Sequence, residues 1–456
     1  EPVLIHTSEG ALNCYYHNVF TIDENRFLLM YYEGISDSTG YIKAKVITVN
    51  DDNTFVAGTA VTVASGISLP YGGLGLIINL VRINENEDRF IFTATSSPYS
   101  KSSMDCNAGV FKVTGTAITP EVNKRIFRIS IIDKSGYASS KSQLLPTVYE
   151  NKFLFITSYG DSDNKGKFFA LKMSVLTVGT DTGTLKTTLS NTSFVNMSDA
   201  LKTAGLPIYD ANNYYASIAI KGFHVVHISG NKYVLFYSNT SSGHLCQGTF
   251  TITDSGSFSY LKIQKLSSQK YSYSDGEAYT INPVKIQDDM YAFPYRLSTD
   301  VGFTNRIIKF DSTTNEFTII DNSVVPIDKN KVVSQYCTGF APDNMIALDN
   351  RVFVRLGLNH FSELFYSGNY YLPSDVYTLS GGFAKYDRSP LPIAYLGNGR
   401  IVMTATVGDN SGKYIINACV VTLGGLKLKK SGDIVCGLLL SDATTTQKGK
   451  IAKFVP

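Results

Sequence analysis

Short apolar runs recur along the chain, and each begins just after a polar turn. An apolar residue is followed by two or three residues of Asn, Asp, Gly or Glu, then by a basic residue and a new apolar run. Five copies are IDENRF (22–27), VYENKF (148–153), ISGNKY (228–233), ALDNRV (347–352) and LGNGRI (396–401), and NEDRF (86–90) and IQDDMY (286–291) are looser versions. Because these turn residues tolerate positive φ angles, each copy predicts a β-hairpin.

The run after each turn predicts the second strand of a hairpin. The seven runs are FLLMYY (27–32), FIFTAT (90–95), FLFITS (153–158), YVLFYS (233–238), YAFPYR (291–296), VFVRLG (352–357) and IVMTAT (401–406). They are nearly continuous in apolar character, which is typical of strands covered on both faces.

A third strand with clearer alternation follows each second strand after a polar loop. The predicted third strands are 41–49, 109–116, 168–176, 245–253, 306–312, 382–387 and 414–423. A more polar fourth strand closes most units, as in FVAGTAVTV (55–63), FSYLKIQKL (258–266) and EFTIIDN (316–322).

The spacing of the repeat predicts an all-β propeller of four-stranded blades. Seven blades are expected, one for each second strand, with six or eight as alternatives, and a period of ~40–50 residues or slightly more is typical of a blade. The blades are predicted near 18–66, 77–127, 143–195, 221–268, 280–328, 336–388 and 389–430, all within one domain, 1–430, with an insertion at 196–220. The N-terminal EPVLIH is expected to supply the outer strand of the last blade and close the ring.

Two segments depart from the repeat. In 196–217, SDALKTAGL predicts one short helix, with Ser198 as N-cap and Gly205 as its end. A Tyr-rich insertion is predicted at 364–382, between the second and third strands of the sixth blade, where no clear fourth strand follows.

Composition and charge support a β protein and exclude some partners. The chain has 29 Tyr and 26 Phe, no Trp, and a net charge of +3. Without a strongly basic face, a nucleic-acid partner is not expected. No apolar stretch approaches the ~20 residues that span a bilayer, so membrane insertion is not expected either.

Few residues form patterns typical of a metal or cofactor site. The six cysteines, Cys14, Cys106, Cys246, Cys337, Cys419 and Cys436, lie far apart and are expected to be free buried thiols. DSDNKG (161–166) resembles a calcium loop but has Lys172 where a bidentate carboxylate is needed. His224 and His227, three apart in a strand, point to opposite faces. No cofactor and no metal are therefore expected.

The sequence shows no clear catalytic pattern. SDSTGY (36–41) faintly resembles a sialidase Asp-box, but no arginine triad can be placed. Glycoside hydrolysis needs two carboxylates, and the seven predicted second strands contain no Asp or Glu. No catalytic residue is therefore assigned, and a protein that is not an enzyme is expected.

Aromatic loops are the strongest candidates for ligand contacts. Tyr stacks on sugar rings or anchors a protein partner while its hydroxyl stays hydrogen-bonded. For any single tyrosine, packing between blades is the alternative role. The candidate ligand-binding residues are Tyr71, Tyr99, Tyr137, Tyr214, Tyr215, Tyr271, Tyr273, Tyr279, Tyr370 and Tyr371.

Residues 431–456, SGDIVCGLLLSDATTTQKGKIAKFVP, resemble the closing hairpin module of tail-fibre and receptor-binding proteins from phages and phage-tail-like bacteriocins. The resemblance implies a trimeric fibre tip that contacts other fibre or baseplate subunits, resides on a virion or tail-like particle, and acts outside the target cell. It also implies binding of a bacterial surface glycopolymer or surface-layer protein. The start at Glu1 fits a tip domain separated from its shaft.

The leading hypothesis is thus a receptor-binding propeller without catalysis, with weak sites multiplied by trimerisation. The first alternative is a carbohydrate-active enzyme of propeller fold, either a glycosidase or a lyase. The second alternative is a secreted scaffold that binds a protein.

Overall fold

The computed structural model of the chain describes most of the repeat. The described residues are 2–7, 16–34, 39–68, 76–96, 103–130, 142–161, 168–206, 223–239, 244–270, 283–294, 303–320, 325–327, 345–348, 351–355, 360–367, 370–373, 377–379, 392–408, 414–423, 438–439 and 451–452. Among them, no helix is both long and apolar enough to cross a membrane.

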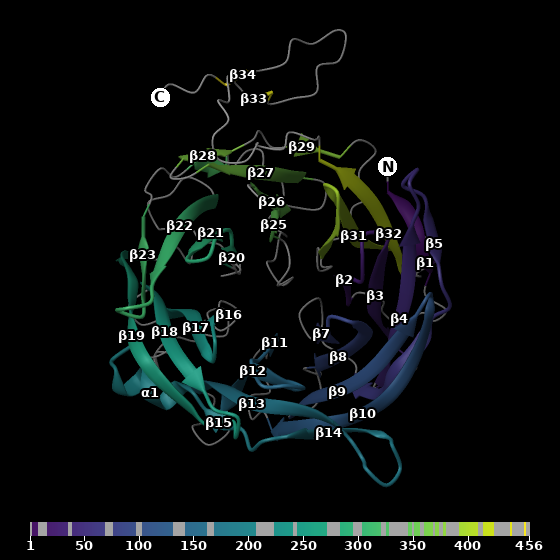
Figure 1. The fold of residues 1–456 in the computed structure, drawn as a ribbon, viewed down its shortest axis with the longest axis horizontal. Helices are drawn as coiled ribbons and strands as arrows, with labels where there is room; N and C mark the ends of the chain where they lie inside the picture. The colour runs from purple at the N-terminus through teal and green to yellow at the C-terminus, as the bar shows by residue number, and fades with distance from the viewer. Residues whose placement is uncertain are drawn as a thin grey trace.

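Within these residues, seven antiparallel sheets of four or five strands stand around a common axis, as Figure 1 shows. The predicted seven-bladed β-propeller is confirmed. Blades 1 to 6 each run from an innermost strand at the axis to outer strands at the rim, in the order of the sequence.

The first three blades contain fourteen of the described strands. Blade 1 comprises β2 (His17–Thr21), β3 (Arg26–Gly34), β4 (Thr39–Val49), β5 (Phe55–Ala57) and β6 (Val61–Ser68). Blade 2 comprises β7 (Leu76–Asn84), β8 (Glu87–Ser96), β9 (Ser103–Thr114) and β10 (Ala117–Ser130). Blade 3 comprises β11 (Ser142–Pro146), β12 (Lys152–Asp161), β13 (Phe168–Thr180), β14 (Thr187–Asn191) and β15 (Val195–Asn196).

The remaining blades follow the same order. Blade 4 comprises β16 (His224–Ser229), β17 (Lys232–Asn239), β18 (His244–Ile252) and β19 (Phe258–Lys270). Blade 5 comprises β20 (Val284–Lys285), β21 (Met290–Pro294), β22 (Phe303–Asp311), β23 (Glu316–Ile319) and β24 (Val325–Ile327). Blade 6 comprises β25 (Met345–Leu348), β26 (Arg351–Arg355), β27 (His360–Ser367), β28 (Tyr370–Pro373) and β29 (Tyr377–Thr378).

Blade 7 is built from both ends of the repeat. It comprises β30 (Ile393–Gly397), β31 (Arg400–Gly408) and β32 (Tyr414–Thr422), with the N-terminal β1 (Val3–Thr7) as its outermost strand. The pairing of Val3 with Ala418 and of Thr7 with Ile415 joins the purple and yellow-green ends of the ribbon in Figure 1. The prediction that the N-terminal segment closes the ring is confirmed. Beyond the ring, β33 (Leu438–Leu439) pairs with β34 (Ile451–Ala452).

Blade 6 differs from its predicted form. Its third strand is β27, which follows directly on the second strand, and β28 and β29 both pair with β27. The expected third strand at 382–387 was therefore wrong, and that segment lies outside the described residues. The error arose because LFYS (364–367) was taken as the start of a loop insertion, and the sequence from 360 to 367 shows no regular alternation that would mark it as a strand.

The predicted helix is present as α1 (Ser198–Thr203), but its cap differs from the prediction. Met197 occupies the cap position without a side-chain hydrogen bond, and the Ser198 hydroxyl accepts the Leu171 N–H at 2.7 Å instead. Gly205, with φ 72°, ends the helix as expected, because this left-handed conformation favours glycine.

The continuous apolar character of the second strands follows from packing between blades. On β3, Leu28, Met30 and Tyr32 pack in the core shared with blade 2. Phe27, Leu29 and Tyr31 alternate with them and pack in the core shared with blade 7. Because successive side chains of a strand point to opposite faces, a strand between two blades has to be apolar at every position.

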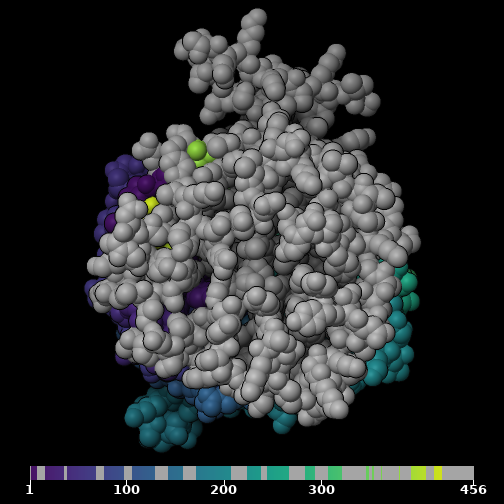
Figure 2. Space-filling model, turned by 180° about the vertical axis from the view of Figure 1, so that it is seen from behind, coloured from purple at the N-terminus to yellow at the C-terminus, as the bar shows by residue number. Residues whose placement is uncertain are grey.

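The repeated turns lie on one face of the ring, which we call the hairpin face. Their residues adopt the expected positive φ angles, such as 55° at Asn151, 54° at Gly230 and 52° at Asn398. The innermost strands begin at the opposite face, which we call the start face. In Figure 2 the described residues of blades 1 and 2 (purple and blue) and of blade 4 (teal) form opposite parts of the rim.

Candidate functional site

A cavity of about 610 Å³ lies on the axis of the ring. Residues from all seven blades line it, mainly from the innermost strands. They are Val19, Phe20, Thr21, Asn79, Leu80, Arg82, Phe90, Gln143, Leu144, Leu145, His224, Pro283, Val284, Lys285, Ile346, Ile393, Ala394 and Tyr395. Its volume is within the ~300–1,000 Å³ that is typical of small-molecule sites.

Side-chain amides join neighbouring innermost strands around this cavity. Asn18 donates to the Ile78 carbonyl at 3.1 Å, and Asn79 donates to the Ser142 hydroxyl at 3.0 Å. Gln143 donates to the Val225 carbonyl at 2.7 Å and accepts the Val225 N–H at 2.8 Å. Because these bonds link blades 1 to 4 in series, the wall of the cavity is fixed before any ligand arrives.

His224 lies in this wall, and its hydrogen bonds define one ring nitrogen as an acceptor. The Val225 N–H fixes the oxygen of the Gln143 amide, so the amide nitrogen is the group 3.4 Å from His224 Nε2. An amide nitrogen can only donate, so Nε2 accepts and the imidazole carries its proton on Nδ1. His227, its neighbour in β16, is exposed and contacts the Gly230 carbonyl, which agrees with the expected opposite faces.

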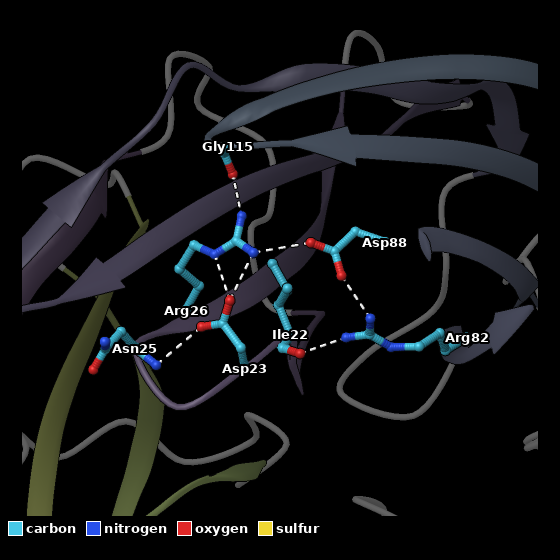
Figure 3. Close-up of polar contacts among 7 residues, drawn as sticks. All are labelled: Ile22, Asp23, Asn25, Arg26, Arg82, Asp88 and Gly115. Carbon is cyan, nitrogen blue, oxygen red and sulfur yellow. Dashed lines mark hydrogen bonds and ion pairs between the residues drawn. The ribbon is translucent and has the colours of Figure 1, made fainter. Parts of the chain in front are cut away.

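Arg82 is the best-fixed charged residue of the cavity lining. Its Nη1 donates to Asp88 Oδ1 at 2.5 Å, and its Nη2 donates to the Ile22 carbonyl (Figure 3). The guanidinium also lies 5.0 Å from the centre of the Phe90 ring. These contacts on two sides hold the guanidinium in one orientation.

Asp88 belongs to a larger ion-pair network between blades 1 and 2. It also accepts from Arg26 Nη2 at 2.9 Å, and Arg26 Nε donates to Asp23 at 2.7 Å (Figure 3). Burial raises the pKa of the Asp23 carboxyl, but hydrogen bonds from Arg26 and the Asn25 N–H outweigh it, so the pKa is lowered overall. Asp23 therefore stays ionised and holds the Arg26 guanidinium in place through their ion pair.

Buried carboxylates lie at strand ends on the start face, contrary to the expectation from the second strands. β3 extends past Tyr32 to include Glu33, which is 6% exposed and paired with Lys43. Asp105, on β9, is 4% exposed and accepts from Arg128 at 2.7 and 2.8 Å. The backbone of β12 also extends to an acidic residue, Asp161. The predicted strands 27–32, 109–116 and 153–158 were shorter than the observed β3, β9 and β12, which removed these acids from consideration.

Most of the predicted ligand-binding tyrosines cannot be placed. Tyr71, Tyr99, Tyr137, Tyr214, Tyr215, Tyr271, Tyr273 and Tyr279 lie outside the described residues, as does most of the calcium-like segment at 161–166. Tyr370 and Tyr371 belong to β28, paired with Ser367 and Tyr366, so they lie in a strand rather than in a loop. Their contacts with a ligand stay a prediction.

The described residues contain no group of three or more His, Cys, Asp and Glu side chains that could hold a metal ion. Cys106, Cys246 and Cys419 are free and buried, as expected of isolated thiols. Burial raises the pKa of Cys106, which keeps this thiol protonated.

No protein-family model matches the sequence, and no curated protein matches it. Solved structures similar in fold include the α-L-arabinofuranosidase Arb93A of Fusarium graminearum, with 11% identity over 93% of this chain and 98% of that chain, at a TM-score of 0.43. The α-L-arabinanase of Penicillium chrysogenum matches with 11% identity over 92% of this chain and 97% of that chain, at a TM-score of 0.44. The sialidase of Trypanosoma rangeli matches with 9% identity over 82% of this chain but 57% of its own length, at a TM-score of 0.39.

These similarities are of fold, and the three proteins named are glycosidases. The leading hypothesis of receptor binding without catalysis is therefore replaced, as a proposal, by the first alternative of a carbohydrate-active enzyme, and the expectation of a protein that is not an enzyme is corrected with it. The structure also removes one premise of that expectation, because Glu33 and Asp161 do lie on second strands.

Proposed function

We propose that the chain is a carbohydrate-active enzyme, a glycosidase or a lyase, that binds its glycan in the axial cavity. The cavity itself is the observation that supports this proposal. Its wall combines amide, hydroxyl and imidazole groups from Asn79, Gln143, Thr21 and His224 with apolar surfaces such as that of Tyr395. Polar groups suit the hydroxyls of a sugar, and the flat apolar surfaces suit the faces of its ring.

The described lining of the cavity does not by itself supply the catalytic groups. No carboxylate is among the lining residues that the structure describes, whereas hydrolysis of a glycoside needs an acid and a base or nucleophile. The buried Glu33 and Asp105 and the strand-terminal Asp161 are the candidate acids. All three lie toward the start face of the ring, in blades 1, 2 and 3.

Turnover of a panel of bacterial cell-surface and plant polysaccharides, followed by release of reducing ends, tests this proposal. Bacterial surface glycans are the substrate class to test first, because they were the predicted partner. Glu33→Gln, Asp105→Asn and Asp161→Asn should be compared with the unchanged protein. We expect at least one of them to lower the rate by about 10²-fold or more while glycan binding persists.

Absence of product from every polysaccharide would overturn the proposal. Turnover that survives all three changes together would instead exclude Glu33, Asp105 and Asp161 as the catalytic acids. A lyase is distinguished from a glycosidase by its unsaturated product, which absorbs ultraviolet light. The resemblance of residues 431–456 to a fibre module, the trimeric state and the residence on a particle stay predictions.

A further inference from the structure

The charges of the axial cavity are of one sign. Arg82, from blade 2, and Lys285, from blade 5, are the charged residues among its described lining, apart from the titratable His224. A cleft that presents one sign of charge raises the local concentration of oppositely charged ligands. The lining therefore favours a neutral or anionic ligand over a cationic one.

Arg82 has hydrogen-bonding capacity that the protein does not use. A guanidinium carries five N–H donors, and Arg82 directs one to Asp88 and one to the Ile22 carbonyl. The other three make no hydrogen bond within the described part of the chain. Asp88 also accepts from Arg26, so one negative charge is shared between two guanidinium groups. A guanidinium that is held in one orientation and has unused N–H donors suits a planar carboxylate or a phosphate.

Lys285 supplies a second cation, and the protein holds its side chain less tightly than that of Arg82. Its side chain is 48% exposed, and its only described ion pair is with Asp288 at 3.7 Å, which is too long for a hydrogen bond. An exposed lysine can turn toward a ligand without breaking a buried contact. The two cations thus have different roles, with Arg82 orienting an anionic group and Lys285 attracting it.

We propose that the axial cavity selects a glycan that carries an anionic group, either a carboxylate or a phosphate, next to its neutral sugar hydroxyls. This inference rests on the proposed function, since it names the substrate class of the same cavity. The amide nitrogens of Asn79 and Gln143 already donate within the protein, so their side-chain oxygens accept from the sugar hydroxyls, while Arg82 and Lys285 recognise the charge.

Binding of matched oligosaccharides by isothermal titration calorimetry tests the selection without requiring turnover. The probes are a trimer of galacturonic acid, a galactose trimer as its neutral counterpart, and glucose 6-phosphate against glucose to distinguish phosphate from carboxylate. We expect an anionic probe to bind about tenfold or more tightly than its neutral partner, with a difference that shrinks as NaCl rises from 50 to 300 mM.

Variants of Lys285 test whether the preference for the anionic probe arises in the axial cavity. Lys285→Gln should weaken the anionic probe roughly two- to fivefold, the usual effect of one exposed ion pair, and leave the neutral probe unchanged. Lys285→Arg should retain the preference. Lys124→Gln, an exposed lysine on β10 with no described ion pair, is the control and should change neither affinity.

Equal binding of charged and neutral probes overturns the inference, as does a Lys285→Gln effect of the same size on both. Failure to bind any anionic probe also overturns it. Failure of the proposed function looks different, because an anion preference without product from any polysaccharide would leave the cavity a binding site and remove only the catalysis.

Discussion

At the residue scale, the basic residue of three repeated turns, in blades 1, 3 and 4, joins neighbouring blades. Arg26 Nη1 donates to the Gly115 carbonyl of blade 2 at 2.6 Å. Lys152 pairs with Asp254 of blade 4 at 2.7 Å, and Lys232 donates to Asn315 of blade 5 at 2.6 Å. In all three cases the partner lies in the turn between the third and fourth strands of the next blade. The basic residue recurs in the sequence because the contact recurs around the ring.

We expect Arg26→Met to lower the free energy of unfolding by roughly 1–3 kcal/mol, since it removes charged hydrogen bonds to Asp23 and Asp88 from a side chain that is 22% exposed. Lys152→Met should lower the free energy of unfolding by less than about 1 kcal/mol, because Asp254 is 65% exposed and water replaces the ion pair. Urea denaturation measures both. A larger loss for Lys152→Met than for Arg26→Met would contradict this ranking.

At the element scale, β1 closes the ring through a contact that involves a buried histidine. His6 is 8% exposed and packs on Tyr31 of blade 1, with 4.1 Å between ring centres. Lys45 Nζ lies 3.5 Å from His6 Nδ1, and Lys43 is paired with Glu33 nearby. Burial above all, then the charge of Lys45, lowers the pKa of His6 from 6.5 to about 4, although Glu33 opposes the shift.

The lowered pKa predicts acid sensitivity of the closing strand. Between pH 6.5 and about 4 the unfolded chain binds a proton at His6 that the folded chain does not, so stability falls as pH falls through this window. The loss in the free energy of unfolding reaches roughly 3 kcal/mol once the pH is below about 4, and there is no loss above pH 6.5. We expect His6→Phe, which cannot be protonated, to flatten the fall in urea midpoint between pH 7 and 4.5.

His227→Phe is the matched control, because His227 is exposed on β16 and takes no part in the closure. Hydrogen exchange should show that the amides of β1 and β32 lose protection first as the pH is lowered. His6 would be excluded as the acid-sensitive group if hydrogen exchange in β1 were unchanged at pH 4.5. It would also be excluded if the urea midpoint fell equally with pH in the unchanged protein and in His6→Phe.

At the scale of the whole molecule, the N-terminal strand closes the ring of blades. β1 covers the outer edge of β32, and Ile5 fills the core between blades 7 and 1. Without β1 that edge has unpaired backbone groups and the core has a void. The N-terminal strand therefore stabilises blades that are far from it in sequence.

Deletion of residues 1–7 should lower the thermal midpoint by several degrees, in keeping with the loss of one buried apolar side chain and one row of strand hydrogen bonds. Deletion of 431–456 is the control, because among the described strands β33 and β34 pair only with each other and stand outside the ring in Figure 1. Calorimetry compares the two. A greater loss from the C-terminal deletion would show that the closing strand is not the main constraint on the ring.

The local pattern was sufficient to predict strands but not their ends. FLLMYY was recognised as the second strand of blade 1 because every position is apolar, yet β3 continues through the charged Glu33. Glu33 remains in the strand because Lys43 on β4 neutralises it, a contact that no pattern within β3 indicates. The third strand of blade 6 was misplaced for a similar reason, since only its pairing with β26 distinguishes β27 from a loop.

The sequence by itself determined the class of fold, the seven blades and the closure by the N-terminus, because turns and strand periodicity are local properties of a few neighbouring residues. The tertiary structure decided which residues line the candidate site. Arg82, His224 and Lys285 are separated by tens of residues or more and share no motif, and they line one cavity only because seven innermost strands meet at the axis. Proximity between blades depends on how the whole ring closes, and residues that it brings together need not resemble one another in sequence.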